Sequence, residues 1–246
     1  MTIYSNLQEQ IYAAASTRVV GSVKSIVGLN LTVGGLETLA GIGSRCEVHS
    51  RKGRVSGEVV GLEGDDLCIL PFGEWDGVAV GDPVELIAFD DLIHPDDSWI
   101  GTVVDGLGRP LSKYRSAPRA HRRRASKPQP PRAFDRKPVG RRLETQIKCI
   151  DLFTPLCQGQ RMGVFAGSGV GKSTMMAMLA RNTDADLIVI GLIGERGREV
   201  QQFIQEDLGP EGMARAVVVV STGDEAPLMR KQAALTTTAI AEHFRK

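Results

Sequence analysis

The stretch that decides the fold is Arg161-Met-Gly-Val-Phe-Ala-Gly-Ser-Gly-Val-Gly-Lys-Ser173, in which an apolar run enters a glycine-rich loop. Residues 173–182, which follow, are rich in Met, Ala and Leu and predict a helix. A strand, a glycine loop and a helix in this order place backbone N–H groups at a helix N-terminus, where they can surround a phosphate. The sequence therefore predicts a strand at 161–166 and a phosphate-binding loop at 166–173.

Each residue type in this loop has a chemical task. Glycines let consecutive N–H groups point at the phosphates, the lysine reaches the β and γ oxygens, and the hydroxyl of Ser173 ligates Mg²⁺. The strict motif begins with Gly, whereas this chain has Ala166. The expected ligands are ATP and Mg²⁺. The residues expected to contact them are Gly167, Ser168, Gly169, Val170, Gly171, Lys172, Ser173 and Thr174.

A second charged cluster, Gly194-Glu-Arg-Gly-Arg-Glu199, follows the apolar run 187–193. Ligands of open α/β sheets bind at the carboxyl ends of the strands. Glu195 would therefore face the γ-phosphate, where a carboxylate can orient and polarise the attacking water. The alternative is a solvated charge cluster after a strand.

The C-terminal part of the chain alternates strands with helices. The runs 187–193 and 216–220 are apolar without alternation, residues 199–205 look helical, and a long helix runs from about 227 to the end. Apolar strands of this kind are typical of a parallel sheet covered on both faces. We therefore expect an α/β fold over residues 146–246.

Residues 17–92 have a different pattern, of short β-branched runs separated by glycines. Strands at such short intervals predict a small antiparallel barrel. The sequence shows no clustered His or Cys and no paired carboxylates there, so a scaffold or assembly role is expected. The expected strands are 18–26, 29–33, 44–49, 56–62, 65–70 and 83–88.

A basic, proline-rich segment lies between these two parts. Residues 113–142 contain twelve Lys/Arg, one acidic residue and five prolines, and the rest of the chain holds 18 basic and 28 acidic residues. We expect residues 93–145 to be an extended linker. Contact of its basic segment with an anionic membrane surface is one interpretation, and a solvated linker is the other. Residues 1–16 are read as an N-terminal helix or tail, either frayed or docking a partner.

Composition excludes some classes of protein. The longest apolar run is 187–193, far short of the roughly 20 residues of a membrane helix. The N-terminus shows no signal peptide. The four cysteines have no metal-type spacing, so they are read as reduced, mostly buried thiols of a cytosolic protein.

The loop, together with Gly194-Glu-Arg-Gly-Arg-Glu199, resembles the catalytic subunits of rotary ATP synthases and their type III secretion relatives. Phe165-Ala-Gly-Ser168 is similar to the flagellar/type III branch, in which Ala166 is expected. In the N-terminal part, Gly43-Ser-Arg-Cys46 and Leu70-Pro-Phe-Gly73 resemble the flagellar export ATPases. Three further stretches agree: Gly101-Thr-Val-Val-Asp-Gly-Leu-Gly-Arg-Pro-Leu111, Ile150-Asp-Leu-Phe-Thr-Pro-Leu156 and Ser221-Thr-Gly-Asp-Glu-Ala-Pro227.

The resemblance implies a RecA-like P-loop NTPase core behind a β-barrel, assembling as a homohexamer that energises flagellar protein export. By this match Lys172 and Ser173 hold the phosphates and Mg²⁺, Glu195 activates water, and Arg196 supports the site. It also implies regulatory and export-apparatus partners, exported protein substrates, and a cytoplasmic location, with contact at the inner-membrane export gate as an extension. Gln146 stands where relatives usually carry Gly.

The chain ends at Lys246, ahead of family segments that include a Mg²⁺-supporting acidic residue and an interfacial arginine, so truncation and weak turnover are expected. The alternatives are an injectisome ATPase, a chain that binds nucleotide and partners without turnover, and an RNA-translocating RecA-like hexamer. The basic segment offers only Tyr114 and Phe134 for base stacking, so no nucleic-acid partner is expected.

Overall fold

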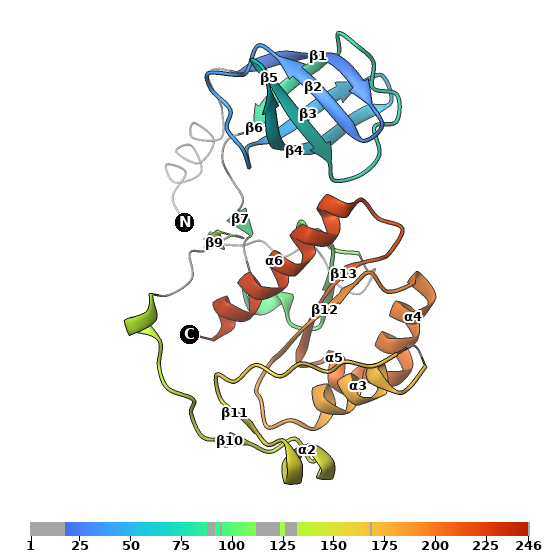
Figure 1. The fold of residues 1–246 in the computed structure, drawn as a ribbon. Coiled ribbons are helices and arrows are strands. Elements are labelled where there is room, and N and C mark those ends of the chain that lie inside the picture. The colour runs from blue at the N-terminus through green and yellow to red at the C-terminus, as the bar shows by residue number, and fades with distance from the viewer. Residues whose placement is uncertain are drawn as a thin grey trace, which may run out of the picture. The chain divides into compact units, whose positions relative to one another are not determined.

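The computed structural model describes residues 18–87, 92–93, 95–111, 124–125, 132–167 and 169–245. The chain divides into two compact units, residues 1–90 and 91–246, and each is described by itself (Figure 1). The expected helix or tail at 1–16 lies outside the described residues. So does more than half of the basic segment 113–142.

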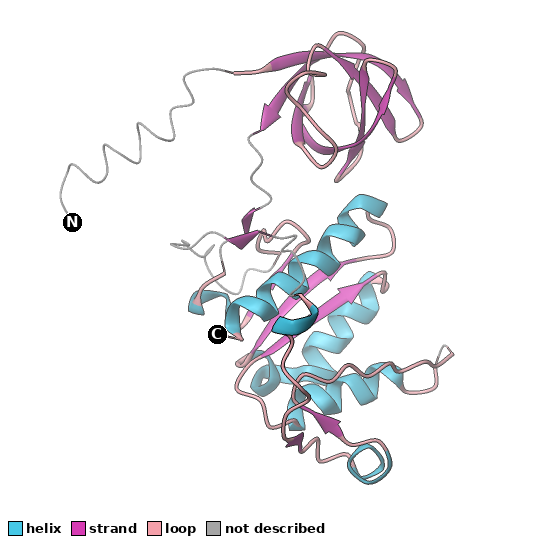
Figure 2. Cartoon of the chain, turned by 60° about the vertical axis from the view of Figure 1, so that its left-hand side comes forward, coloured by secondary structure: helices cyan, strands magenta, loops and turns pink. Residues whose placement is uncertain are grey.

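The first unit contains a closed antiparallel barrel, as the sequence predicts, with the strand order β1-β2-β5-β4-β3-β6. Because every strand pairs on both sides, the barrel has no free edge (Figure 2). In the two-residue turn between β4 and β5, Gly64 has φ +64°, a conformation that favours glycine. The strands are β1 (Val20–Val27), β2 (Asn30–Gly34), β3 (Arg45–Ser50), β4 (Gly53–Glu63), β5 (Asp66–Pro71) and β6 (Pro83–Ile87).

Every second side chain along the strands points into the barrel, and these side chains fill its interior. In β3, Cys46 and Val48 are fully buried while Glu47 and His49 lie on the outer side. In β5, Leu67 and Ile69 are fully buried in the same way. Period-two alternation of this kind is how an antiparallel sheet separates its core face from its solvent face.

The second unit contains a parallel sheet of three strands in the order β12-β13-β8. All six residues of the central strand β13 are buried. Val218 and Val220 contribute to one core and Val217 and Val219 to the other, so both faces of the sheet are covered. The strands are β8 (Thr102–Val104), which the sequence did not predict, β12 (Ile188–Ile193) and β13 (Ala216–Ser221).

Helices cover both faces of this sheet. On one face lie α3 (Lys172–Asn182), α4 (Gly197–Gln202), the π-helix η3 (Phe203–Leu208) and α5 (Gly209–Met213). The opposite face is covered by α6 (Pro227–Phe244), the long red helix of Figure 1. The predicted helices 173–182 and 227 onwards are confirmed, whereas the predicted helix 199–205 is divided between α4 and η3. None of the helices in the described part of the chain is long and apolar enough to cross a membrane.

The remaining elements are short. Two antiparallel pairs, β7 with β9 and β10 with β11, and three short helices complete the second unit. Before the last of these helices, Gln146 has φ +57°, which explains why glycine is favoured at this position. The bounds are β7 (Leu92–Ile93), β9 (Arg124–Ala125), β10 (Arg142–Leu143), β11 (Leu156–Cys157), η1 (Asp97–Trp99), η2 (Ala133–Asp135) and α2 (Lys148–Phe153).

Two expectations are wrong. No strand forms at 161–166, because a strand needs a neighbour for its N–H and C=O groups and no described strand flanks this segment; the side chain of Phe165 is 98% exposed. The thiols are also less buried than expected. Cys46 is buried, Cys68 and Cys157 are half-buried and Cys149 is exposed, and all four are free.

Candidate nucleotide-binding site

The glycine loop takes the backbone shape that its composition predicts. Gly169 has φ +76° and Gly171 has φ +92°, both in the left-handed region that side chains disfavour. Gly171 is also the N-cap of α3, so the loop turns directly into the helix. The predicted contact residue Ser168 lies outside the described residues.

The N-terminus of α3 is open to an anion. Lys172, Ser173 and Thr174 form the first turn of this eleven-residue helix and are exposed. No side chain among the described residues caps the helix, and its first turn carries no acidic residue. Its free N–H groups and positive dipole end therefore favour phosphate.

A cavity of about 630 Å³ lies beside this helix. Lys172 and Ser173 line it from α3, and Glu195 and Glu199 line it from the segment that follows β12. The volume falls within the range of small-molecule sites. The rest of the lining is largely apolar and includes Met162, Val164, Met176 and Leu192.

The backbone around Glu195 is hydrogen-bonded to the end of β13 and to the loop that follows it. The N–H of Gly194, whose φ is +81°, donates to the carbonyl oxygen of Ser221 at 2.7 Å. The N–H of Gly223 donates to the carbonyl oxygen of Glu195 at 3.1 Å. A Cβ atom on Gly223 would lie 3.1 Å from the Gly194 oxygen, so the two loops meet at a distance that favours glycine. The carboxyl ends of β12 and β13 therefore position Glu195 together.

Arg196 is placed differently from Glu195. It does not line the cavity, its side chain is 72% exposed, and its Nη1 lies 3.2 Å from Oε1 of Glu199. Glu199 therefore connects Arg196 to the cavity wall, a role that the sequence analysis missed. The spacing of three residues at the start of a helix was the available signal.

The cavity lining thus brings together three of the predicted site residues, Lys172, Ser173 and Glu195. Gly223 is a further contributor that the sequence analysis did not identify, although it lies in the quoted stretch 221–227. The other predicted residues within the described chain do not line the cavity: Gly167, Gly169, Val170, Gly171, Thr174 and Arg196.

Both units match one family. Residues 146–246 match the nucleotide-binding domain of the ATP synthase alpha/beta family, and residues 23–86 match its beta-barrel domain. Curated relatives include flagellum-specific ATP synthases from Caulobacter vibrioides, 42% identical over 230 residues, and from Bacillus subtilis, 40% identical over 228 residues. Each alignment covers 92% of this chain and 51% of the relative. The chain therefore spans about half the length of these relatives.

A solved structure agrees with the fold. The assembled ATPase EscN of the type III secretion system of enteropathogenic E. coli is similar with a TM-score of 0.82 and 34% identity, covering 92% of this chain and 53% of EscN. The predicted barrel and parallel-sheet nucleotide-binding domain are both confirmed by these matches. The chain belongs to the ATP synthase alpha/beta family, and its similarity is to the flagellar and type III secretion members.

Proposed function

We propose that this chain is the nucleotide-binding part of an ATPase that energises flagellar type III protein export. The observation that carries the proposal is the cavity lined by Lys172 and Ser173 from the first turn of α3 and by Glu195 from the loop that follows β12. A cation, a hydroxyl and a carboxylate beside an open helix N-terminus are the groups that ATP hydrolysis requires. The similarity to flagellum-specific ATP synthases supports the export role.

The residues present fit ATP and Mg²⁺. Lys172 binds the terminal phosphates as a point charge, the first-turn N–H groups of α3 hold the phosphate oxygens, and Ser173 offers a hydroxyl ligand. Glu195 orients a water by accepting a hydrogen bond from it, and accepts its proton as the water attacks. When bound, Mg²⁺ supplies positive charge that offsets the charge developing on the phosphates. Arg196 fixes Glu199 at the cavity wall through their ion pair.

We propose that the working form is a homohexamer with regulatory, export-apparatus and exported protein partners, acting on the cytoplasmic side of the inner membrane. EscN is described as an assembled ATPase and as a complex with its central stalk EscO, which supports oligomerisation and partner binding. Injectisome secretion is the second candidate, favoured by this same similarity. Restoring motility in a flagellar ATPase deletion strain, with the chain in its full-length context, would favour the flagellar role over secretion by an injectisome.

The binding site is tested by Lys172→Ala. Removal of the cation at the phosphates should lower the affinity for MgATP at least about tenfold, or about 1.4 kcal/mol, in calorimetric titration of the chain. Lys148→Ala is the matched control, because Lys148 is an exposed helix-terminal lysine on α2, away from the cavity lining. Unchanged affinity in Lys172→Ala would overturn the assignment of the loop.

Catalysis is tested by Glu195→Gln. The amide keeps the shape of the side chain but cannot take a proton, so with the chain in its full-length context ATP affinity should persist while phosphate release falls by about 10²–10⁴-fold. A variant that hydrolyses at the normal rate would assign water activation to another residue. Binding without any phosphate release by the unmodified chain would favour the alternative of a nucleotide-binding chain without turnover.

A further inference from the structure

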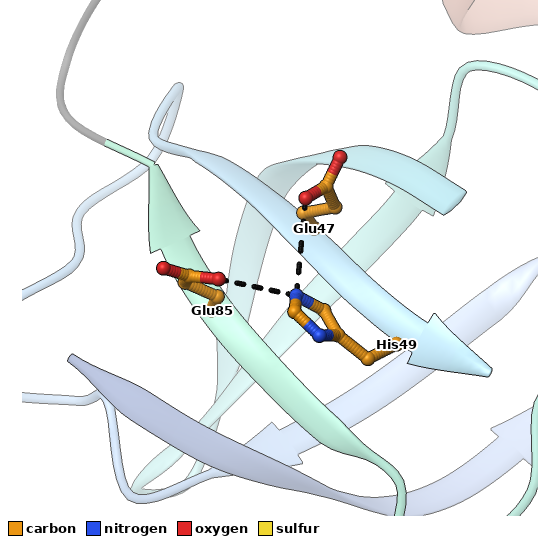
Figure 3. Close-up of side chains that lie close together, drawn as sticks. All are labelled: Glu47, His49 and Glu85. Carbon is orange, nitrogen blue, oxygen red and sulfur yellow. Dashed lines mark ion pairs between the residues drawn. The ribbon is translucent and has the colours of Figure 1, made fainter. Parts of the chain in front are cut away.

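Three potential metal ligands meet on the outer surface of the barrel. Glu47 and His49 lie on β3 and Glu85 lies on β6, and their ligand atoms are all within 4.8 Å of one another (Figure 3). The sequence analysis found no such cluster, because Glu85 is far from the other two along the chain. The strand pairing places Glu47 directly opposite Glu85.

Positive charge between these two carboxylates would stabilise the arrangement. Two carboxylates that face each other directly across an antiparallel pair destabilise it. The Nε2 atom of His49 lies between them, 3.1 Å from Oε2 of Glu85 and 3.8 Å from Oε2 of Glu47. This nitrogen is buried, and among the described residues no group meets it with hydrogen-bond geometry, the 3.1 Å approach of Glu85 included. A lone pair on this nitrogen would therefore face two carboxylate oxygens.

The spacing of these atoms fits a small tetrahedral cation. Two ligands at zinc distances of about 2.0–2.2 Å lie about 3.3–3.6 Å apart at the tetrahedral angle. The separation of 3.1 Å between His49 Nε2 and Glu85 Oε2 lies just below this range, and the separation of 3.8 Å between His49 Nε2 and Glu47 Oε2 lies just above it. One imidazole and two carboxylates suit zinc better than Mg²⁺ or Ca²⁺, which prefer oxygen ligands alone.

We propose that Glu47, His49 and Glu85 bind one Zn²⁺ ion, with a fourth position open to water. The ion joins β3 to β6, the last strand of the barrel, at a pair where two carboxylates lie directly opposite each other. The site is built entirely from barrel residues, none of which lines the nucleotide cavity.

Two arginines compete with the metal for these carboxylates. Arg54 on β4 places Nη1 3.0 Å from Oε2 of Glu47, the oxygen nearest to His49, and Arg18 places Nε 3.5 Å from Oε1 of Glu85. The Arg18 contact leaves Oε2 of Glu85 available. Arg54 must give up or share its oxygen when zinc binds, so the removal of Arg54 should strengthen zinc binding. This expectation separates a metal site from a network of ion pairs.

The test is calorimetric titration of the chelator-treated chain with ZnCl₂ at neutral pH. We expect one site per chain that is weakened about a hundredfold or more in His49→Gln, because the loss of outer partners of a ligand alone costs about 10–100-fold. Glu85→Gln should weaken it in the same direction. Glu63→Gln, which removes an exposed carboxylate elsewhere on the barrel, should leave it unchanged. Circular dichroism of each variant establishes that it is folded.

Arg54→Gln supplies the discriminating result. We expect it to tighten zinc binding about twofold to fivefold, the range of one exposed ion pair. Co²⁺ titration excludes the free cysteines as ligands, because thiolates give an intense sulfur-to-metal absorption band that imidazole and carboxylates do not. Zinc binding that persists in His49→Gln, a thiolate band, or no binding at all would each overturn the proposal.

Discussion

In the barrel every strand pairs on both sides, whereas in the described parallel sheet only β13 has two neighbours and β12 and β8 have one each. The barrel is closed by its own hydrogen bonds and filled by its own core. The sheet depends on helices for both of its faces, and its strand β12, with the segment that follows it, lines the nucleotide cavity. The difference teaches that closure of the sheet provides stability in one unit, while a strand with only one described neighbour, β12, lines the site in the other.

The largest expected effect on stability is that of a substitution in the barrel core, which tests whether the barrel is stabilised by its own packing. Ile69 is fully buried and pairs with Leu31 and Val59 on the neighbouring strands. Ile69→Ala should lower the free energy of unfolding of the barrel by about 2–5 kcal/mol, because it leaves a cavity in a closed structure. Amide hydrogen exchange in β2, β4 and β5 measures this loss.

The same experiment can break the comparison. Ile42→Ala is the matched control, since Ile42 is 69% exposed, and a surface change of this kind should cost no more than about 0.5 kcal/mol. Exchange in β13 should not change in Ile69→Ala if the barrel is stabilised by itself. Equal acceleration in β13 would show that the two units unfold together.

A smaller effect is expected at Arg215, which joins the C-terminus of α3 to the start of β13. Its Nη1 donates to the carbonyl oxygen of Ala185 at 2.7 Å, and its Nη2 donates to those of Ala180 at 3.0 Å and Arg181 at 2.6 Å. These carbonyls lie at and just beyond the end of a helix, where a cation is favoured. Arg215→Ala should destabilise the second unit by about 1–3 kcal/mol.

Two comparisons make this prediction specific. Arg215→Lys keeps the charge but loses the planar fork of donors, so it should recover only part of the stability. Arg54→Ala on the barrel removes an exposed arginine that contacts one carboxylate and should cost less than about 1 kcal/mol. An equal loss in Arg54→Ala and Arg215→Ala, by thermal unfolding or hydrogen exchange, would contradict the capping role of Arg215.

Much of this comparison could be predicted from the sequence. Short β-branched runs separated by glycines predicted the barrel, and the uniformly apolar run 216–220 predicted a strand buried on both faces. The glycine loop and Gly194-Glu-Arg-Gly-Arg-Glu199 predicted the three residues that line the cavity. These signals are local, because periodicity and loop motifs depend only on residues that are consecutive in the sequence.

The rest depends on which segments become neighbours. The strand expected at 161–166 does not form because no described strand flanks it, and β8 is a strand because β13 lies beside it. The contact of Gly223 with Glu195 and the pairing of Glu47 with Glu85 likewise arise only when separate segments meet. Residue identity alone does not specify such pairs.

The last prediction concerns the reactivity of the thiols, which reports on the opening of each unit in the unaltered chain. Cys46 is fully buried in the barrel, and burial raises the pKa of its thiol to about 12, whereas Cys149 is exposed on α2. A raised pKa keeps the thiol neutral until high pH, so at pH 9 on the order of one Cys46 thiol in a thousand is the reactive thiolate. Iodoacetamide should therefore modify Cys149 quickly and Cys46 only when the barrel opens. Mass spectrometry of the modified peptides over time measures both rates, and Ile69→Ala should accelerate the modification of Cys46 but not that of Cys149. Modification of Cys46 as fast as Cys149 in the unaltered chain would mean that the closed barrel opens readily, and the contrast between the two units would fail.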